Sequence, residues 1–130
     1  MFKRVIVKRM YIFSFEKLEV WKEATKLSKD VYKVTSSFPS DEKFGLVSQI
    51  RRATNSIGAN LAEGTSRITN KDKAHFTTIA FSTTMEVLNH LILSKELEFI
   101  SEEEYLNLRE RIYKISNMLN ALRKSQLKKE

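Results

Sequence analysis

Few residues in this sequence are of the types that carry out catalysis. Cysteine is absent, and the two histidines are His75 and His90. Glu86 and His90 are four residues apart, so on a helix they would share a face and could supply two ligands to a metal ion. A metal centre in a helical bundle, however, needs carboxylates and Glu-x-x-His pairs that converge from several helices. The other segments expected to be helical offer no inward-facing acid, so we expect no metal, no cofactor and an ordinary hydrogen bond for His90.

Motifs of common enzyme classes do not occur. The sequence has no glycine-rich phosphate loop, no G-x-S-x-G turn and no H-E-x-x-H motif. The absence of cysteine suits a reducing compartment, and no apolar run approaches the roughly 18 residues of a membrane span. The opening residues MFKRVIVKRMYIF make a poor signal peptide, because Lys8 and Arg9 interrupt the apolar stretch. We expect a cytoplasmic protein that is not an enzyme and has no membrane partner.

The formal net charge of +7 lies at the two ends of the chain. Residues 1–14 hold four basic residues and no acid, and residues 114–130 hold five basic residues and one acid. Basic ends can bind a polyanion such as nucleic acid, or they can be solvated tails. Aromatic stacking on bases is less supported, because only Tyr11 and Phe13 lie outside the expected core seams. The candidate nucleic-acid contacts are Lys3, Arg4, Lys8, Arg9, Arg67, Lys71, Arg123, Lys124, Lys128 and Lys129.

Four segments have the apolar spacing of amphipathic helices, namely residues 16–36, 41–63, 71–98 and the chain from 101 onward. Short loops make sequential helices antiparallel neighbours. We therefore expect an all-α fold, an antiparallel up-down-up-down four-helix bundle with a short N-terminal arm. The expected parts are a basic arm at residues 1–14, the bundle at 15–126 and a basic tail at 127–130.

Each expected helix has an inner seam of apolar or small residues. Gly64 is expected to end the second helix, and Ser101 and Glu104 form a capping box that begins the fourth. The seams comprise Val20, Ala24, Leu27, Val31 and Val34; Val47, Ile50, Thr54, Ile57 and Leu61; Phe76, Ala80, Thr83, Val87 and Leu91; and Tyr105, Leu108, Ile112, Ile115, Leu119 and Leu122.

The second and third helices each carry a further face that an isolated bundle does not need. On the third helix this face is a second apolar seam, and on the second helix it is a stripe of mostly small or uncharged residues. Gly58 costs about 1 kcal/mol relative to alanine in a helix interior, which indicates a packing reason. We interpret the two faces together as a subunit interface; the alternative is that the third helix is the central helix of a tight monomer. The interface candidates are Gly45, Gln49, Arg52, Ser56, Ala59, Glu63, Phe81, Met85, Leu88 and Ile92.

Glu86 lies among apolar residues in the sequence, so its carboxylate needs a partner. Arg51, on the neighbouring helix, is the first candidate for a structural ion pair with Glu86. Arg52 is the second and could reach across a subunit boundary, since a planar guanidinium can bind a carboxylate with two hydrogen bonds.

Several strings in the sequence are unusual in combination. They are LEVWKEA (18–24), FPSDEKFGLVSQIRRA (38–53) and SIGANLAEGTSR (56–67), together with Glu86. Over about residues 15 to 125 the chain resembles the four-helix-bundle proteins encoded in intervening sequences of bacterial 23S ribosomal RNA genes. The resemblance implies a small bundle that assembles into a ring, commonly a pentamer, with a basic surface suited to nucleic acid and with no catalysed reaction.

The chain departs from the family pattern at Ser82 and Thr83, where the family tends to show glycine and serine. The change replaces small residues by small residues, so close packing should survive.

Related bundles serve as accessory subunits of reverse transcriptases in diversity-generating retroelements. We therefore expect a homo-oligomer that binds nucleic acid, RNA before DNA. The alternatives are an adaptor for a partner protein such as a polymerase or reverse transcriptase, and an oligomer with no ligand of its own.

Overall fold

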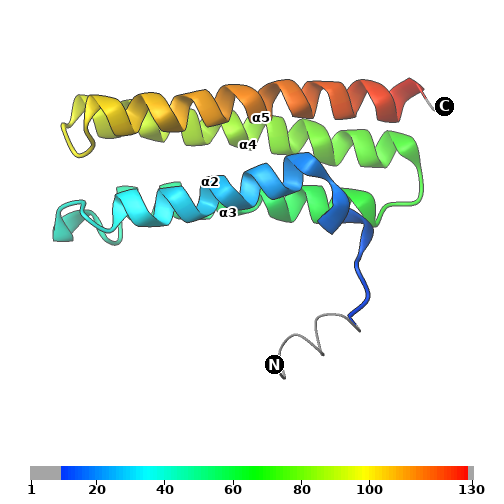
Figure 1. Cartoon of the computed structure of the whole chain (residues 1–130), viewed down its shortest axis with the longest axis horizontal. Coiled ribbons are helices and arrows are strands. Elements are labelled where there is room, and N and C mark those ends of the chain that lie inside the picture. The colour runs from blue at the N-terminus through cyan, green and yellow to red at the C-terminus, as the bar shows by residue number, and fades with distance from the viewer. Residues whose placement is uncertain (1–9, 129–130) are drawn as a thin grey trace.

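Four α-helices run antiparallel to their sequence neighbours in the computed structural model, which describes residues 10–128 (Figure 1). Each helix contacts the next one along the chain, and α2 also contacts α5, which closes the bundle. The predicted all-α, up-down-up-down fold is confirmed. The elements in chain order are the short 3-10 helix η1 (Ser14–Lys17), α2 (Glu19–Thr35), the 3-10 helix η2 (Ser40–Glu42), α3 (Leu46–Thr65), α4 (Asn70–Glu96) and α5 (Glu102–Lys128).

The predicted seams of α2, α3 and α5 form the core. Leu27, Ile57 and Ile115 are among the side chains with no solvent exposure. On α4 the predicted seam is wrong in part: Thr84 is buried, whereas Phe76 and Thr83 are half-buried. The Thr84 hydroxyl donates a hydrogen bond of 2.8 Å to the Ala80 carbonyl, so this polar group can lie in the core without an unsatisfied donor.

Gly64 has a different role from the predicted one. The helix continues through it to Thr65, and Gly64 is buried against α4. A Cβ atom on Gly64 would lie 2.9 Å from the Cβ of Phe76, which is closer than two carbon atoms can pack. The glycine therefore permits the close approach of α3 and α4, and it does not end the helix.

Gly58 also has its packing reason inside the chain. The indole of Trp21 on α2 lies over it, and a Cβ at this position would be 3.4 Å from Trp21 Nε1. The packing reason predicted for this glycine is therefore the contact between α2 and α3.

Polar residues mark the start of α5. Ser101 and Glu104 form the predicted capping box, with hydrogen bonds of 3.0 and 3.1 Å between side chains and backbone N–H groups. At the other end of α5 the helix extends through Lys128, past the position 127 at which we expect the basic tail to begin. Within residues 10–128, no helix is long and apolar enough to cross a membrane.

Candidate nucleic-acid interface and assembly surfaces

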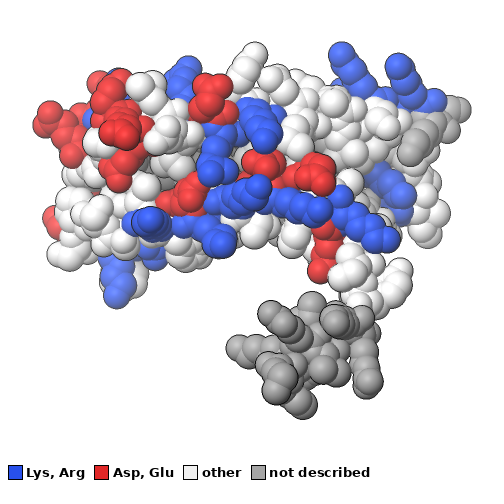
Figure 2. All heavy atoms as spheres, viewed as in Figure 1, with Lys and Arg blue, Asp and Glu red and all other residues white. Residues whose placement is uncertain are grey.

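The two ends of the bundle differ in charge. The α4–α5 loop and the α2–α3 turn lie at one end, and Figure 2 shows acidic side chains gathered there. The α3–α4 loop, the start of α2 and the last turns of α5 lie at the other end. We call the cations at this second end the basic end; its members are Arg67, Lys71, Arg123, Lys124 and Lys128. Five of the ten predicted nucleic-acid contacts therefore lie together.

Contacts between α4 and α5 bring the basic end together. Arg123 Nε donates a hydrogen bond of 2.8 Å to Thr78 Oγ1, and Thr77 Oγ1 donates one of 2.8 Å to Gln126 Oε1. In the α3–α4 loop, the Arg67 guanidinium lies 4.5 Å from the centre of the Phe76 ring. The two arginines are thus positioned by neighbouring side chains.

The cations of the basic end have no carboxylate partner among the described residues, since none takes part in the ion pairs found in 10–128. Two acids, Glu63 and Asp72, lie in the same region of the sequence and reduce its net charge. The other predicted contacts, Lys3, Arg4, Lys8, Arg9 and Lys129, lie outside the residues that the structure describes.

Sequence reasoning missed a row of lysines on α2. These residues are spaced four, three and four apart, so they share one exposed face of the helix, and Figure 2 shows basic side chains along the middle of this view. The row comprises Lys22, Lys26, Lys29 and Lys33. The spacing of these lysines can be seen in the sequence. Two of them pair with Glu19 and Glu23, which lowers the charge that the row offers to a ligand.

The predicted interface residues of α3 lie on its outer surface. Gln49, Arg52, Ala59 and Glu63 are exposed, and Gly45 and Ser56 are half-buried. On α4, Met85 and Ile92 are exposed, but Phe81 and Leu88 are half-buried and pack against the chain's own core. The second apolar seam of α4 is therefore used in part within the chain.

The stripe on α3 and the second apolar seam of α4 lie on different sides of the bundle. Thr77 and Lys95 contact α5, through Gln126 and Glu102. The apolar seam from Phe81 to Ile92 continues the helical spacing between these two contacts, so it borders α5. The stripe on α3 cannot border that side, because α3 packs against the flank of α4 that carries Phe76. The two faces that we interpret together as a subunit interface are therefore two separate patches on one chain.

Arg51 and Glu86 have other partners in the structure. Arg51 Nε donates a hydrogen bond of 2.9 Å to Thr35 Oγ1, and its guanidinium lies 4.5 Å from the centre of the Tyr32 ring. The side chain of Glu86 is 55% exposed and lies 3.2 Å from His90 Nε2. Within the described residues, the predicted ion pair between Arg51 and Glu86 does not form, because Arg51 faces α2 and Glu86 faces solvent.

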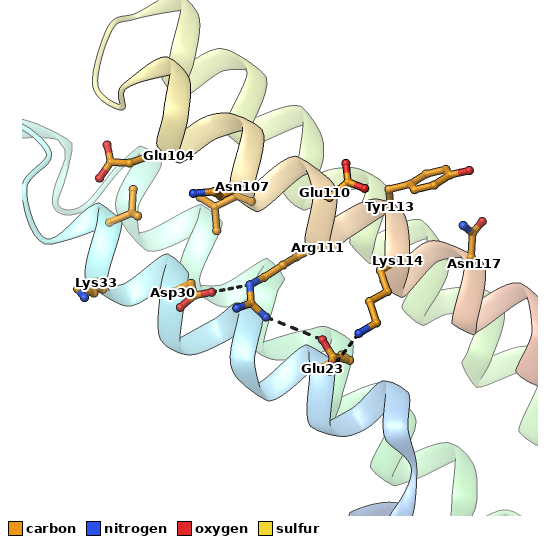
Figure 3. Close-up of a pocket in the computed structure, with 12 residues that line it drawn as sticks. Glu23, Asp30, Lys33, Glu104, Asn107, Glu110, Arg111, Tyr113, Lys114 and Asn117 are labelled. Carbon is orange, nitrogen blue, oxygen red and sulfur yellow. Dashed lines mark ion pairs between the residues drawn. The ribbon is translucent and has the colours of Figure 1, made fainter.

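A charged groove with a volume of about 940 Å³ lies between α2 and α5 (Figure 3). Arg111 of α5 reaches across it, with its Nε 2.8 Å from Asp30 Oδ2 and a terminal nitrogen 3.8 Å from Glu23 Oε1. Lys114 lies 3.6 Å from Glu23 Oε2. These pairs tie α2 to α5. The expectation that this helix offers no inward-facing acid is wrong, because Glu23 is buried on the seam side of α2, between Val20 and Leu27, a spacing that could have identified it.

The environment of Glu23 changes its pKa. Burial alone would raise this pKa, but the hydrogen bond from Lys26 and the charges of Lys114, Lys26 and Arg111 outweigh burial and hold the pKa of Glu23 below its usual value. Elsewhere, within residues 10–128, no three His, Asp or Glu side chains lie close enough to hold a metal ion.

The pKa of Glu23 predicts how stability depends on pH. Because the folded-state pKa is lower than the unfolded-state value, the ionised carboxylate stabilises the fold above the unfolded-state pKa, and this contribution is lost as the pH falls through the folded-state pKa. We expect Glu23→Gln to cost about 1 kcal/mol in the free energy of unfolding at pH 7, since its cations are largely in solvent. This cost should disappear at pH values below the folded-state pKa of Glu23. Urea unfolding of the wild type and the variant, from pH 7 down to below this pKa, measures the difference in the free energy of unfolding.

Glu110→Gln is the matched control, because Glu110 lines the same groove but is exposed and forms none of its ion pairs. We expect this variant to follow the wild-type pH profile. A constant difference between Glu23→Gln and wild type at all pH values would contradict the assigned role of the carboxylate.

A small all-α bundle with one basic end, and with two separate outer patches on α3 and α4, is the class of protein that these observations define. The model of the 23S rRNA-intervening sequence protein family matches residues 16–121. The chain belongs to this family, and the resemblance inferred from its motifs is confirmed.

Among solved structures, the chain is similar to a crystal structure from Bacteroides thetaiotaomicron, described as a protein with unknown function from the S23 ribosomal protein family. The two share 24% sequence identity and a TM-score of 0.75 over 81% of this chain and 98% of that one, which shows a common fold. No curated protein matches the chain.

Proposed function

We propose that this protein is a non-enzymatic homo-oligomer of the cytoplasm that binds nucleic acid, RNA before DNA. The observation that carries the proposal is the basic end, where cations from the α3–α4 loop, α4 and α5 gather without carboxylate partners among the described residues. Lysine and arginine at such a surface contact phosphates, so binding should tolerate sequence changes and weaken steeply with salt. The preference for RNA rests on the family to which the chain belongs.

The assembly that we propose is a ring, with five subunits as the resemblance implies. Two separate patches on one chain support a ring, because a head-to-tail contact joins a patch on one subunit to a different patch on the next. The stripe on α3 and the exposed part of the α4 seam are two such patches. In a ring, the basic ends of all copies would repeat around one axis and present several phosphate-binding sites to one nucleic acid.

The proposal is tested by removing three exposed lysines of the basic end in one variant, Lys71→Ala, Lys124→Ala and Lys128→Ala. We expect weaker binding of a mixed-sequence RNA oligonucleotide, by a similar factor for different sequences. The slope of the logarithm of affinity against the logarithm of salt concentration should fall by about 2, since each phosphate contact to a single strand contributes about 0.7. Fluorescence anisotropy over a salt series measures both, and light scattering on the same samples gives the mass of the assembly.

The matched control removes three lysines elsewhere, with Lys29→Ala, Lys33→Ala and Lys43→Ala. These positions lie on α2 and in the turn that follows η2. Equal or larger losses in this control would place binding on these three lysines, and the basic end would not be the site. A wild-type protein that stays monomeric would contradict the ring.

The groove between α2 and α5 favours a second candidate, an adaptor that docks a partner protein such as a polymerase or reverse transcriptase. The groove is large and lined by charged and polar side chains of both helices, including Lys33, Asn107 and Glu110. In this case the basic end would only assist the binding of the partner protein. An assembly that ignores RNA at low salt would favour this candidate over nucleic-acid binding.

A further inference from the structure

The segment before η1 exposes two aromatic rings. Tyr11 is 75% exposed and Phe13 is 59% exposed, although large apolar side chains usually lie inside a fold. Residues 10–13, the described part of this segment, have no helical structure, and residues two apart in an extended chain point to the same side. The rings of Tyr11 and Phe13 accordingly meet, with centroids 5.0 Å apart and planes at 81°.

The base of this segment is fixed to the bundle. The Phe13 backbone N–H donates a hydrogen bond of 2.8 Å to Glu16 Oε2, and the half-buried Phe15 ring packs edge-to-face on Trp21 at 5.2 Å. The two exposed rings therefore project from a defined place. An edge-to-face pair covers at most one face of either ring, so a planar group can still stack on the pair.

The rings lie at the same end of the bundle as the basic end. Phe15 packs on Trp21 in the first turn of α2. The start of α2 lies at the same end as the α3–α4 loop and the last turns of α5, and Figure 1 shows residues 10–13 leaving the bundle at this end. In the sequence, Lys8 and Arg9 precede the aromatic pair, and Glu16 and Lys17 follow it.

We propose that Tyr11 and Phe13 stack on unpaired bases of a single-stranded RNA whose phosphates contact the basic end. The inference rests on the proposed nucleic-acid binding and adds the form of the ligand. Surfaces that bind single strands combine cations along the backbone with aromatic rings on which bases stack. The core of a contact with a second copy would instead be depleted of charge, whereas four charged residues flank the rings in the sequence, three of them cations.

The test compares a labelled oligouridylate of about 20 nucleotides with an RNA duplex of equal length, which has no unpaired base to stack. The double variant Tyr11→Ala and Phe13→Ala should bind the single strand at least about tenfold more weakly than the wild type. Its affinity for the duplex should equal that of the wild type. Both positions precede the helices, so circular dichroism should be unchanged. Met10→Ala with Ile12→Ala is the matched control and should change neither affinity.

Three results would overturn the inference. An unchanged affinity of the double variant for the single strand removes the stacking role, while wild-type binding still supports the proposed function. A lower assembly mass with unchanged RNA affinity shows that the rings pack against a second copy. A wild-type protein that binds neither RNA contradicts the proposed function itself, and the inference falls with it.

Discussion

Ile57→Ala is expected to lower the free energy of unfolding by about 2–5 kcal/mol, the range found when a buried large aliphatic side chain is cut back to alanine. Ile57 lies on the inner seam of α3 with 0% exposure, so the variant loses apolar contacts and leaves a cavity that neighbouring helices fill only in part. Domains of this kind are stable by about 5–15 kcal/mol in total. The change should therefore lower the urea midpoint markedly.

Ile68→Ala is the matched control, since the same side chain is 97% exposed in the α3–α4 loop. We expect its free energy of unfolding to stay within about 0.5 kcal/mol of wild type. Both variants should be measured at one protein concentration, because subunit association adds to apparent stability. Equal effects of the two substitutions would contradict the core described for α3.

Gly64→Ala is expected to be less stable than Gly58→Ala by about 1–3 kcal/mol, the cost of overpacking a filled site. Both glycines lie within α3, and no described glycine has a positive φ, so alanine gains about 1 kcal/mol of helix propensity at either position. The gain cancels in the comparison. What differs is the space: the new Cβ would meet the Phe76 Cβ at 2.9 Å in one case and Trp21 Nε1 at 3.4 Å in the other.

Urea unfolding of the two glycine variants measures this difference. Gly58→Ala should equal or exceed the wild type in stability, because its new methyl makes an ordinary contact with the indole. If Gly64→Ala proved as stable as Gly58→Ala, α3 and α4 would not be in the close contact that the structure shows at Phe76.

The sequence by itself determined the number, order and direction of the helices. The apolar spacing in α5 from Tyr105 to Leu122 fits only a helix, and all members of the series except the partly buried Leu122 are buried. The capping box at Ser101 and Glu104 sets a helix start by bonds between residues three apart. These features are local, so the sequence predicts them without knowledge of what packs where.

Only the tertiary structure decided which residues of different helices meet. The partner of Arg51, the side of α4 that borders α5, the contact of Gly64 with Phe76 and the groove crossed by Arg111 all depend on how each helix is rotated about its axis. Several rotations bury nearly the same apolar seams, and shape complementarity between side chains distant in the sequence selects one of them. The basic end has the same origin: cations more than 50 residues apart become neighbours because antiparallel helices bring the α3–α4 loop to the end of α5.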